Sequence, residues 1–121
     1  MGVAGKCLDA RNGSSADGTQ VQIASCSAAA GQQWTVTTGS TIKTLGKCLD
    51  ISGNSTADGA KVQLWACHGG GNQNWQGNAD GSLRNPQSGK CLDVSGGGSA
   101  DGTVVVLWSC HGGANQKWTL P

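Results

Sequence analysis

Two stretches of the chain carry the same set of side chains with binding chemistry. Each set contains one carboxylate, one tryptophan, one imidazole and neighbouring amides, namely Asp50, Gln63, Trp65, His68, Asn72 and Gln73 in one stretch and Asp93, Trp108, His111, Asn115 and Gln116 in the other. A tryptophan ring offers a flat apolar surface to the C–H groups of a pyranose. A carboxylate accepts hydrogen bonds from two neighbouring hydroxyls, and amides donate as well as accept. The two sets therefore suit shallow binding sites for a neutral sugar.

The same side chains do not make a catalytic set. A glycosidase needs two carboxylates about 5–9.5 Å apart across the bond that it breaks. Each stretch provides only one aspartate, and the chain has no nucleophile elbow, metal-binding motif or phosphate-binding loop. We therefore expect a non-catalytic binding protein that needs no cofactor and no metal ion.

The elements that must position these side chains come from an internal repeat. Three motifs occur three times: Gly-Lys-Cys-Leu-Asp begins at positions 5, 46 and 89, Ala-Asp-Gly begins at 16, 57 and 100, and Gln-x-Trp ends at 34, 75 and 118. The first cysteine of every unit precedes the closing tryptophan by 27 positions. We interpret residues 1–121 as one domain of three units, at approximately 1–38, 39–79 and 80–121.

Each unit reads as a few short β-strands with one apolar face. In residues 62–67, Val62 and Leu64 share one face of a strand, while Gln63 and Trp65 share the other. No stretch has the three- to four-residue apolar spacing of a helix. One unit is too small to bury its apolar face alone, whereas three can share a core. Because a propeller takes about four to eight blades, the sequence predicts an all-β fold of another kind, a β-trefoil with pseudo-threefold symmetry.

The six cysteines indicate an oxidising compartment, and we expect a secreted or extracellular protein. The two cysteines of every unit are 19 positions apart. If one unit forms an internal disulfide, its copies should form the same one, which predicts the pairs Cys7–Cys26, Cys48–Cys67 and Cys91–Cys110. A metal site is the alternative, but this spacing matches no zinc pattern and no Cys-x-x-Cys occurs.

The first unit keeps the repeated motifs and lacks the binding set. Ala24 replaces the strand tryptophan, Ser27 replaces the histidine and Gly31 replaces the asparagine. Its cysteines, Asp9 and the closing Trp34 remain. Residues kept in all three units are therefore interpreted as structural, and residues kept in only two are interpreted as binding residues. This difference predicts two working sites and one degenerate site.

Structural roles are the alternative for part of the set. Because Asp9 is kept where the other groups are missing, Asp50 and Asp93 have an alternative interpretation as turn caps or backbone acceptors. Trp65 and Trp108 share a strand face with the cysteines, so we expect them at the surface, with core burial as the alternative. The closing tryptophans are expected in the core, with the preceding glutamines supporting the backbone as well as the ligand. The aspartates of the Ala-Asp-Gly motifs are expected to shape turns.

Composition excludes several classes of partner. The net charge is +1 and only 12% of the residues are charged, so there is no electrostatic case for nucleic acid or an anionic membrane. No apolar run approaches the roughly 20 residues of a membrane span, and we expect no membrane insertion. The first residues lack the basic and apolar regions of a signal peptide, and we expect a mature or excised domain.

The motifs Cys-Leu-Asp, Leu-Trp-x-Cys and Asn-Gln-x-Trp resemble those of the ricin B-type lectins and the family 13 carbohydrate-binding modules. The resemblance extends from Gly5 to Trp118. It implies a β-trefoil whose sugar contacts come from the aspartate, the strand aromatic and the asparagine, which correspond to Asp50, Trp65, Asn72, Asp93, Trp108 and Asn115. It adds contacts made in some members, at Gln63, His68 and His111.

The resemblance also implies a class of ligand. Such proteins bind mostly galactose, lactose and galactosides, and other members bind xylan or arabinose-containing chains. A tryptophan platform resembles the galactose-binding branch, so we favour galactosides, with xylan or arabinan as the alternative. Val106 replaces Gln63 in the third unit, and we expect that site to be weaker or differently selective.

The resemblance bears on context and on a rival function as well. Such modules are often appended to secreted glycoside hydrolases, which fits excision of this chain from a larger enzyme. A trefoil that binds or inhibits proteins is the rival, but it would not need the Asp, Trp and Asn set in duplicate.

Overall fold

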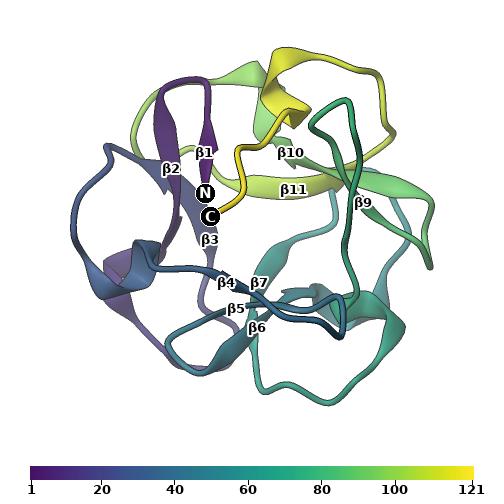
Figure 1. The fold of residues 1–121 in the computed structure, drawn as a ribbon, viewed down its shortest axis with the longest axis horizontal. Coiled ribbons are helices and arrows are strands. Elements are labelled where there is room, and N and C mark those ends of the chain that lie inside the picture. The colour runs from purple at the N-terminus through teal and green to yellow at the C-terminus, as the bar shows by residue number, and fades with distance from the viewer.

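The computed structural model describes all 121 residues, and its regular elements are short β-strands and single 3₁₀ turns. Eleven strands form three antiparallel sheets (Figure 1). The first sheet contains β1 (Gly2–Val3), β2 (Lys6–Ala10) and β3 (Val21–Ala24). The second contains β4 (Thr35–Val36), β5 (Ile42–Thr44), β6 (Lys47–Ile51) and β7 (Val62–Trp65). The third contains β8 (Gln76–Gly77), β9 (Leu83–Asn85), β10 (Lys90–Val94) and β11 (Val105–Trp108).

The longest pairings are three equivalent hairpins, β2 with β3, β6 with β7 and β10 with β11. In the second hairpin, Leu49 pairs with Leu64 and Asp50 pairs with Gln63. Because side chains alternate along a strand, this register places the leucines on the core side and the Asp50–Gln63 pair on the opposite side. The predicted strand faces are therefore confirmed, and the other two hairpins have the same register.

Isolated bridges join the three hairpins around the centre of the molecule (Figure 1). They link Gln20 with Gln63, Gln22 with Val104, and Lys61 with Val106. Gly2 also pairs with Thr119, which brings the two ends of the chain together (Figure 1). The three lobes surround a pseudo-threefold axis, and the expected β-trefoil is confirmed.

The core is one cluster of 18 buried hydrophobic residues that all three repeats share. It contains the closing tryptophans, Trp34, Trp75 and Trp118. Their indole nitrogens donate to the carbonyl oxygens of the leucines in the Cys-Leu-Asp motifs, at 2.9, 3.1 and 3.0 Å. These bonds give every buried indole N–H the partner it needs, and the prediction that these tryptophans lie in the core is confirmed.

Three disulfides form within the repeats, and they are the predicted pairs Cys7–Cys26, Cys48–Cys67 and Cys91–Cys110. Each one joins the first strand of a central hairpin to the segment that follows the second strand. The disulfides therefore fix the start of the loops that leave β3, β7 and β11. The structure contains no helix of the length and apolar character needed to cross a membrane.

Six 3₁₀ turns complete the repeats. The turns η1 (Arg11–Gly13), η3 (Ser52–Asn54) and η5 (Ser95–Gly97) follow the first strand of each central hairpin. The turns η2 (Ala30–Gln32), η4 (Gly71–Gln73) and η6 (Ala114–Gln116) follow the loop after the second strand. The two turns of each repeat lie against one another at the end of the hairpin.

Candidate functional site

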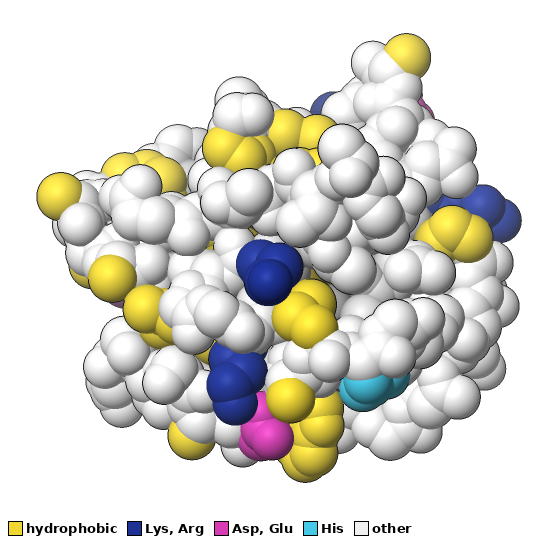
Figure 2. Space-filling view, turned by 60° about the horizontal axis from the view of Figure 1, so that its bottom comes forward, with side chains coloured by type: hydrophobic (Ala, Val, Ile, Leu, Met, Phe, Trp, Pro, Cys, Tyr) yellow, Lys and Arg dark blue, Asp and Glu magenta, His cyan; other side chains and the backbone are white.

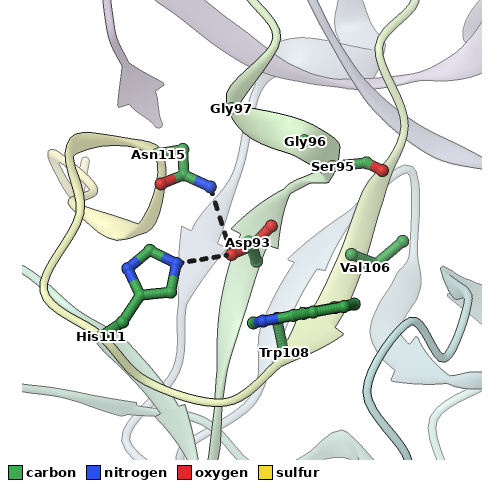
Figure 3. Close-up of a pocket in the computed structure, with 8 residues that line it drawn as sticks. All are labelled: Asp93, Ser95, Gly96, Gly97, Val106, Trp108, His111 and Asn115. Carbon is green, nitrogen blue, oxygen red and sulfur yellow. Dashed lines mark hydrogen bonds and ion pairs between the residues drawn. The ribbon is translucent and has the colours of Figure 1, made fainter.

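A hollow of about 400 Å³ opens at the end of the β10–β11 hairpin (Figure 3). Its lining residues come from the two strands, from η5, from η6 and from the loop that leads into η6: Asp93, Ser95, Gly96, Gly97, Val106, Trp108, His111 and Asn115. A hollow of this volume suits a small ligand. The structure thus brings the predicted aspartate, tryptophan, histidine and asparagine of the third repeat together.

Asp93 lies in this hollow with most of its surface covered, at 3% exposure. Its Oδ2 atom accepts hydrogen bonds from Asn115 Nδ2 at 3.2 Å and from Gln116 Nε2 at 2.8 Å. Its Oδ1 atom has no protein donor. Every fully buried polar side-chain atom of the protein has a hydrogen-bond partner, so Oδ1 is accessible from the hollow. The carboxylate is therefore held through one oxygen and can accept ligand hydroxyls through the other.

Trp108 provides the apolar surface of the hollow. It is 42% exposed, as expected from its place on the strand face opposite the core. Its ring lies beside Asp93 and Val106 (Figure 3). An exposed flat ring next to a half-free carboxylate matches the two faces of a sugar, one lined by C–H groups and one by hydroxyls.

His111 lies across the hollow from Val106 (Figure 3). The backbone N–H of Gly113 donates to its Nδ1 atom at 3.0 Å, which assigns the proton of the neutral ring to Nε2. Nε2 lies 3.5 Å from Asp93 Oδ2. A Cβ atom on Gly113 would come within 2.5 Å of the imidazole, so the loop needs glycine at this position to fold the ring back.

The second repeat forms a matching hollow of about 340 Å³ at the end of the β6–β7 hairpin. Its lining residues are Asp50, Ser52, Gly53, Asn54, Gln63, Trp65, His68 and Asn72. Asp50 Oδ2 accepts from Asn72 Nδ2 at 3.1 Å, and Trp65 is 40% exposed. The imidazole of His68 accepts from the backbone of its loop in the same way as in the third repeat.

The two hollows differ in polarity at two positions. Gln63 Nε2 donates to Asp50 Oδ1 at 3.1 Å, whereas the third repeat has Val106 there and leaves the equivalent oxygen without a donor. At the rim of the second hollow, Asn54 Oδ1 accepts from Gln87 Nε2 at 2.6 Å, so the hairpin of the following repeat reaches this site. The second hollow therefore has more protein hydrogen-bonding groups around its carboxylate.

The first repeat has no such hollow: none of the cavities of the molecule is lined by Asp9. Arg11 takes the place of the serine that begins η3 and η5, and its Nε atom donates to Gln22 Oε1 at 2.7 Å. Gln22 in turn donates to Asp9 Oδ2 at 2.8 Å. Gln63 makes the equivalent contact to Asp50, so the first repeat differs in that Arg11 occupies the other end of the glutamine amide. Ala24 also offers no aromatic surface.

Two predicted site residues, Gln73 and Gln116, do not line the hollows. They are buried behind the carboxylates. Gln73 Nε2 donates to Asp50 Oδ2 at 2.8 Å, and its Oε1 accepts from the backbone N–H of His68 at 3.0 Å. Gln116 makes the same two contacts in the third repeat. These glutamines therefore position the aspartate and the histidine loop rather than face a ligand.

Sequence reasoning missed one wall of each hollow, which η3 and η5 form. Ser52 and Ser95 follow the Cys-Leu-Asp strands almost directly, and each is followed by glycine in both repeats. That shared Ser-Gly after the strand was the available signal. No group of three or more metal-ligating side chains occurs in the structure.

Comparison with known proteins places this geometry in a family. Residues 1–118 match the ricin-type beta-trefoil lectin domain. The structure is similar to the designed 3-fold symmetric protein ThreeFoil, with 39% identity over 95% of this chain and 89% of that one and a TM-score of 0.85. It is also similar to a non-toxic homologue of type II RIPs from Momordica charantia (bitter gourd), solved in complex with α-methyl-D-galactoside, with 27% identity and a TM-score of 0.85.

The chain is shorter than its natural relatives. It is covered to 98% by the match to the bitter gourd protein but spans only 44% of that chain. Over 41 residues it is 46% identical to the ribosome-inactivating protein SNAI′ of Sambucus nigra. This stretch makes up 34% of this chain and 7% of that protein. The family match over almost the whole chain, together with the trefoil and its repeated hollows, leads to one assignment. This chain belongs to the ricin-type β-trefoil lectin family, a family of carbohydrate-binding domains.

Proposed function

We propose that the chain binds galactose-containing glycans reversibly through two sites, the hollows of the second and third repeats. The observation that carries this proposal is the duplicated hollow with its half-exposed tryptophan beside a buried, tethered aspartate. The first repeat has the equivalent hairpin and disulfide but no tryptophan, and none of the cavities of the molecule is lined by its aspartate, Asp9.

The chemistry of each site divides between its two principal groups. The tryptophan covers the apolar C–H face of a pyranose, while the free lone pairs of the aspartate accept from neighbouring ring hydroxyls. Support for galactose comes from the bitter gourd relative, which was solved with a galactoside. Xylan or arabinan is the alternative ligand, because it would use the same stacking surface and carboxylate.

The proposed activity is binding without catalysis. Each hollow is lined by a single carboxylate, and glycoside hydrolysis needs two across one bond. The carboxylate that is present already accepts from side-chain amides, three at Asp50 and two at Asp93, which fixes it as a hydrogen-bond acceptor.

The surface does not favour the rival function of binding another protein through a large apolar face. Only four large hydrophobic side chains are substantially exposed, Val36, Trp65, Trp108 and Leu120, and two of these belong to the hollows. Figure 2 shows hydrophobic side chains in small patches separated by polar atoms on the face that it presents. We further propose that the protein works in a secreted context, because three disulfides suit an oxidising compartment. We also propose that it is part of a longer chain, because it spans only 44% of the bitter gourd protein.

A glycan array that carries galactosides, xylan, arabinan and mannose polymers tests the proposal. We expect binding centred on terminal galactose, and we expect the Trp65→Ala, Trp108→Ala double variant to lose it while it stays folded. A xylan or arabinan signal would move the ligand class and keep the binding function. Silence across the array from a folded sample would contradict carbohydrate binding and favour a protein ligand.

A further inference from the structure

We propose that each sugar site is completed by the repeat before it, with Asp17 and Asp58 as positioning residues for the platform tryptophans Trp65 and Trp108. This inference rests on the proposed sugar sites and concerns residues outside both hollows. It makes the first repeat, which has no site of its own, a working part of the site in the second repeat.

The backbone around Trp65 is held from both sides by one turn of the first repeat. Gly18 N donates to Leu64 O at 2.8 Å, and Leu64 N donates to Thr19 O at 2.9 Å, just before the tryptophan. Just after it, Ala66 N donates to Asp17 Oδ1 at 2.8 Å. Strand β7 has ended at Trp65, so the residue that follows has no ladder partner and depends on this carboxylate.

The same turn also touches the indole. A Cβ atom on Gly18 would lie 4.0 Å from Cζ3 of Trp65, so the bare backbone of the turn borders the ring. The turn also contacts strand β6, because Lys47 Nζ lies 2.7 Å from Asp17 Oδ1. The turn is therefore fixed to both strands of the hairpin whose tryptophan it supports.

The arrangement recurs around the pseudo-threefold axis. Asp58 Oδ1 accepts from Ser109 N at 2.8 Å and lies 3.1 Å from Lys90 Nζ, and Gly59 borders Trp108. In the third copy, Asp101 accepts from the hydroxyl of Ser25 at 3.0–3.1 Å and lies 2.7 Å from Lys6 Nζ. That copy supports Ala24, which has no ring to position. The chain thus contains its own matched control.

Electrostatics agree with tight, ionised contacts at all three turns. The pKa of Asp17 is held below its ordinary value of 3.8, first by the hydrogen bond from Lys47. The pKa of Asp58 is lowered first by the hydroxyl of Ser109, and that of Asp101 first by Lys6. These aspartates are exposed and lie outside the hollows, so their contacts serve the joint between repeats and not the ligand directly.

The test measures one sugar site at a time. The Trp108→Ala background leaves only the second site, and the binding of methyl α-galactoside is followed there by NMR through the indole N–H of Trp65. In this background Asp17→Ala should weaken binding by about threefold to tenfold, the effect of losing one or two hydrogen bonds. Asp17→Asn, which keeps a side-chain oxygen for Ala66 N–H, should recover part of the loss.

The control is Asp101→Ala in the same background, which should bind as tightly as its parent although it loses the contacts with Lys6 and Ser25. In the Trp65→Ala background, Asp58→Ala should weaken the third site, and Asp101→Ala should again leave binding unchanged. The proposal would be overturned if neither Asp17→Ala nor Asp101→Ala weakened binding, or if both weakened it equally.

A ligand-free readout separates this proposal from the function on which it rests. ¹⁵N relaxation of the two exposed indoles in the otherwise unchanged protein should report greater mobility of Trp65 in Asp17→Ala and of Trp108 in Asp58→Ala, with no change at either ring in Asp101→Ala. If the galactoside does not bind the parent protein but the relaxation pattern holds, the sugar assignment fails and the positioning role stands. Unchanged indole mobility in all three variants contradicts the positioning role.

Discussion

At the scale of single residues, most of the side chains that line the two hollows could be predicted from the sequence, because two of the three repeats keep the set and one lacks it. The tryptophans Trp65 and Trp108, with their aspartates, were placed correctly by strand alternation. What could not be read is how the first repeat replaces the site. Arg11 reaches Gln22 only because the fold places η1 next to β3, and no local pattern encodes that contact.

The sequence also did not reveal that neighbouring backbone in the first repeat leaves little room for the missing side chains. A Cβ at Gly31, the position of Asn72, would lie 3.2 Å from the carbonyl oxygen of Ala10. Ala29 stands at the position of Gly70, where any Cβ would come within 2.5 Å of a folded-back histidine. The first repeat therefore differs from the other two in the space around the missing side chains as well as in the side chains themselves.

The two kinds of tryptophan should respond differently to truncation. Trp65→Ala should lower sugar affinity at the second site by roughly 2 kcal/mol, as expected for a central aromatic contact, with little change in Tm because the ring is 40% exposed. Trp75→Ala, at 3% exposure, should destabilise the fold by about 3–5 kcal/mol. Calorimetric binding and thermal melts of both variants check this. A large loss of Tm in Trp65→Ala would show that this ring has a core role.

Residues 63 and 106 should tune the two sites in opposite directions. Val106→Gln adds an amide beside Asp93 and should tighten galactoside binding at the third site, and Gln63→Val should weaken the second site by about 1 kcal/mol, the size of one net hydrogen bond. Titration of each variant in a background that lacks the other site's tryptophan gives the two affinities. If both substitutions leave affinity unchanged, this position does not contact the ligand.

At the scale of elements, the hairpins and disulfides could be predicted because they follow strand alternation and repeat symmetry. The 3₁₀ turns could not, since three-residue turns carry no periodic signal, and η3 and η5 form a wall of each hollow. The Ala-Asp-Gly motifs were expected only to shape turns. In the structure they join neighbouring repeats, a role that depends on contacts 30 or more positions away in the sequence.

These joints predict a dependence of stability on pH. The pKa values of Asp17, Asp58 and Asp101 are lowered in the fold by their Lys and Ser partners. A lowered pKa stabilises the fold fully above the unfolded value of 3.8 and loses that contribution as the pH falls below it. We expect Tm to stay level from pH 7 to about 5 and to fall below about pH 4.

A variant with Asn at all three turns should have a lower Tm near neutral pH and a shallower decline under acid. Thermal melts of the two proteins between pH 3 and pH 7 measure the difference. Parallel curves for the variant and the parent would mean that other groups control the acid transition.

At the scale of the whole molecule, three repeats share one core, so the fold was predictable from their number, spacing and apolar faces. The symmetry of the surface is incomplete, because only two of the three lobes carry a hollow with a tryptophan. Two sites on one rigid trefoil should engage a polymeric glycan together, and avidity then exceeds the affinity of either site.

A comparison of a multivalent galactan with methyl α-galactoside tests this consequence. The parent protein should bind the polymer more tightly per galactose than the monosaccharide, and the Trp65→Ala and Trp108→Ala single variants should lose most of that advantage. Equal affinity for the polymer and the monosaccharide in the parent protein would contradict joint engagement.

The measurement that tests the central claim most directly is the number of sugar molecules bound per chain at saturation with methyl α-galactoside. The two-site account predicts two for the parent protein, one for either single variant, Trp65→Ala or Trp108→Ala, and none for the double variant. Three bound sugars, or binding that survives in the folded double variant, would contradict the assignment of the sites to the hollows of the second and third repeats.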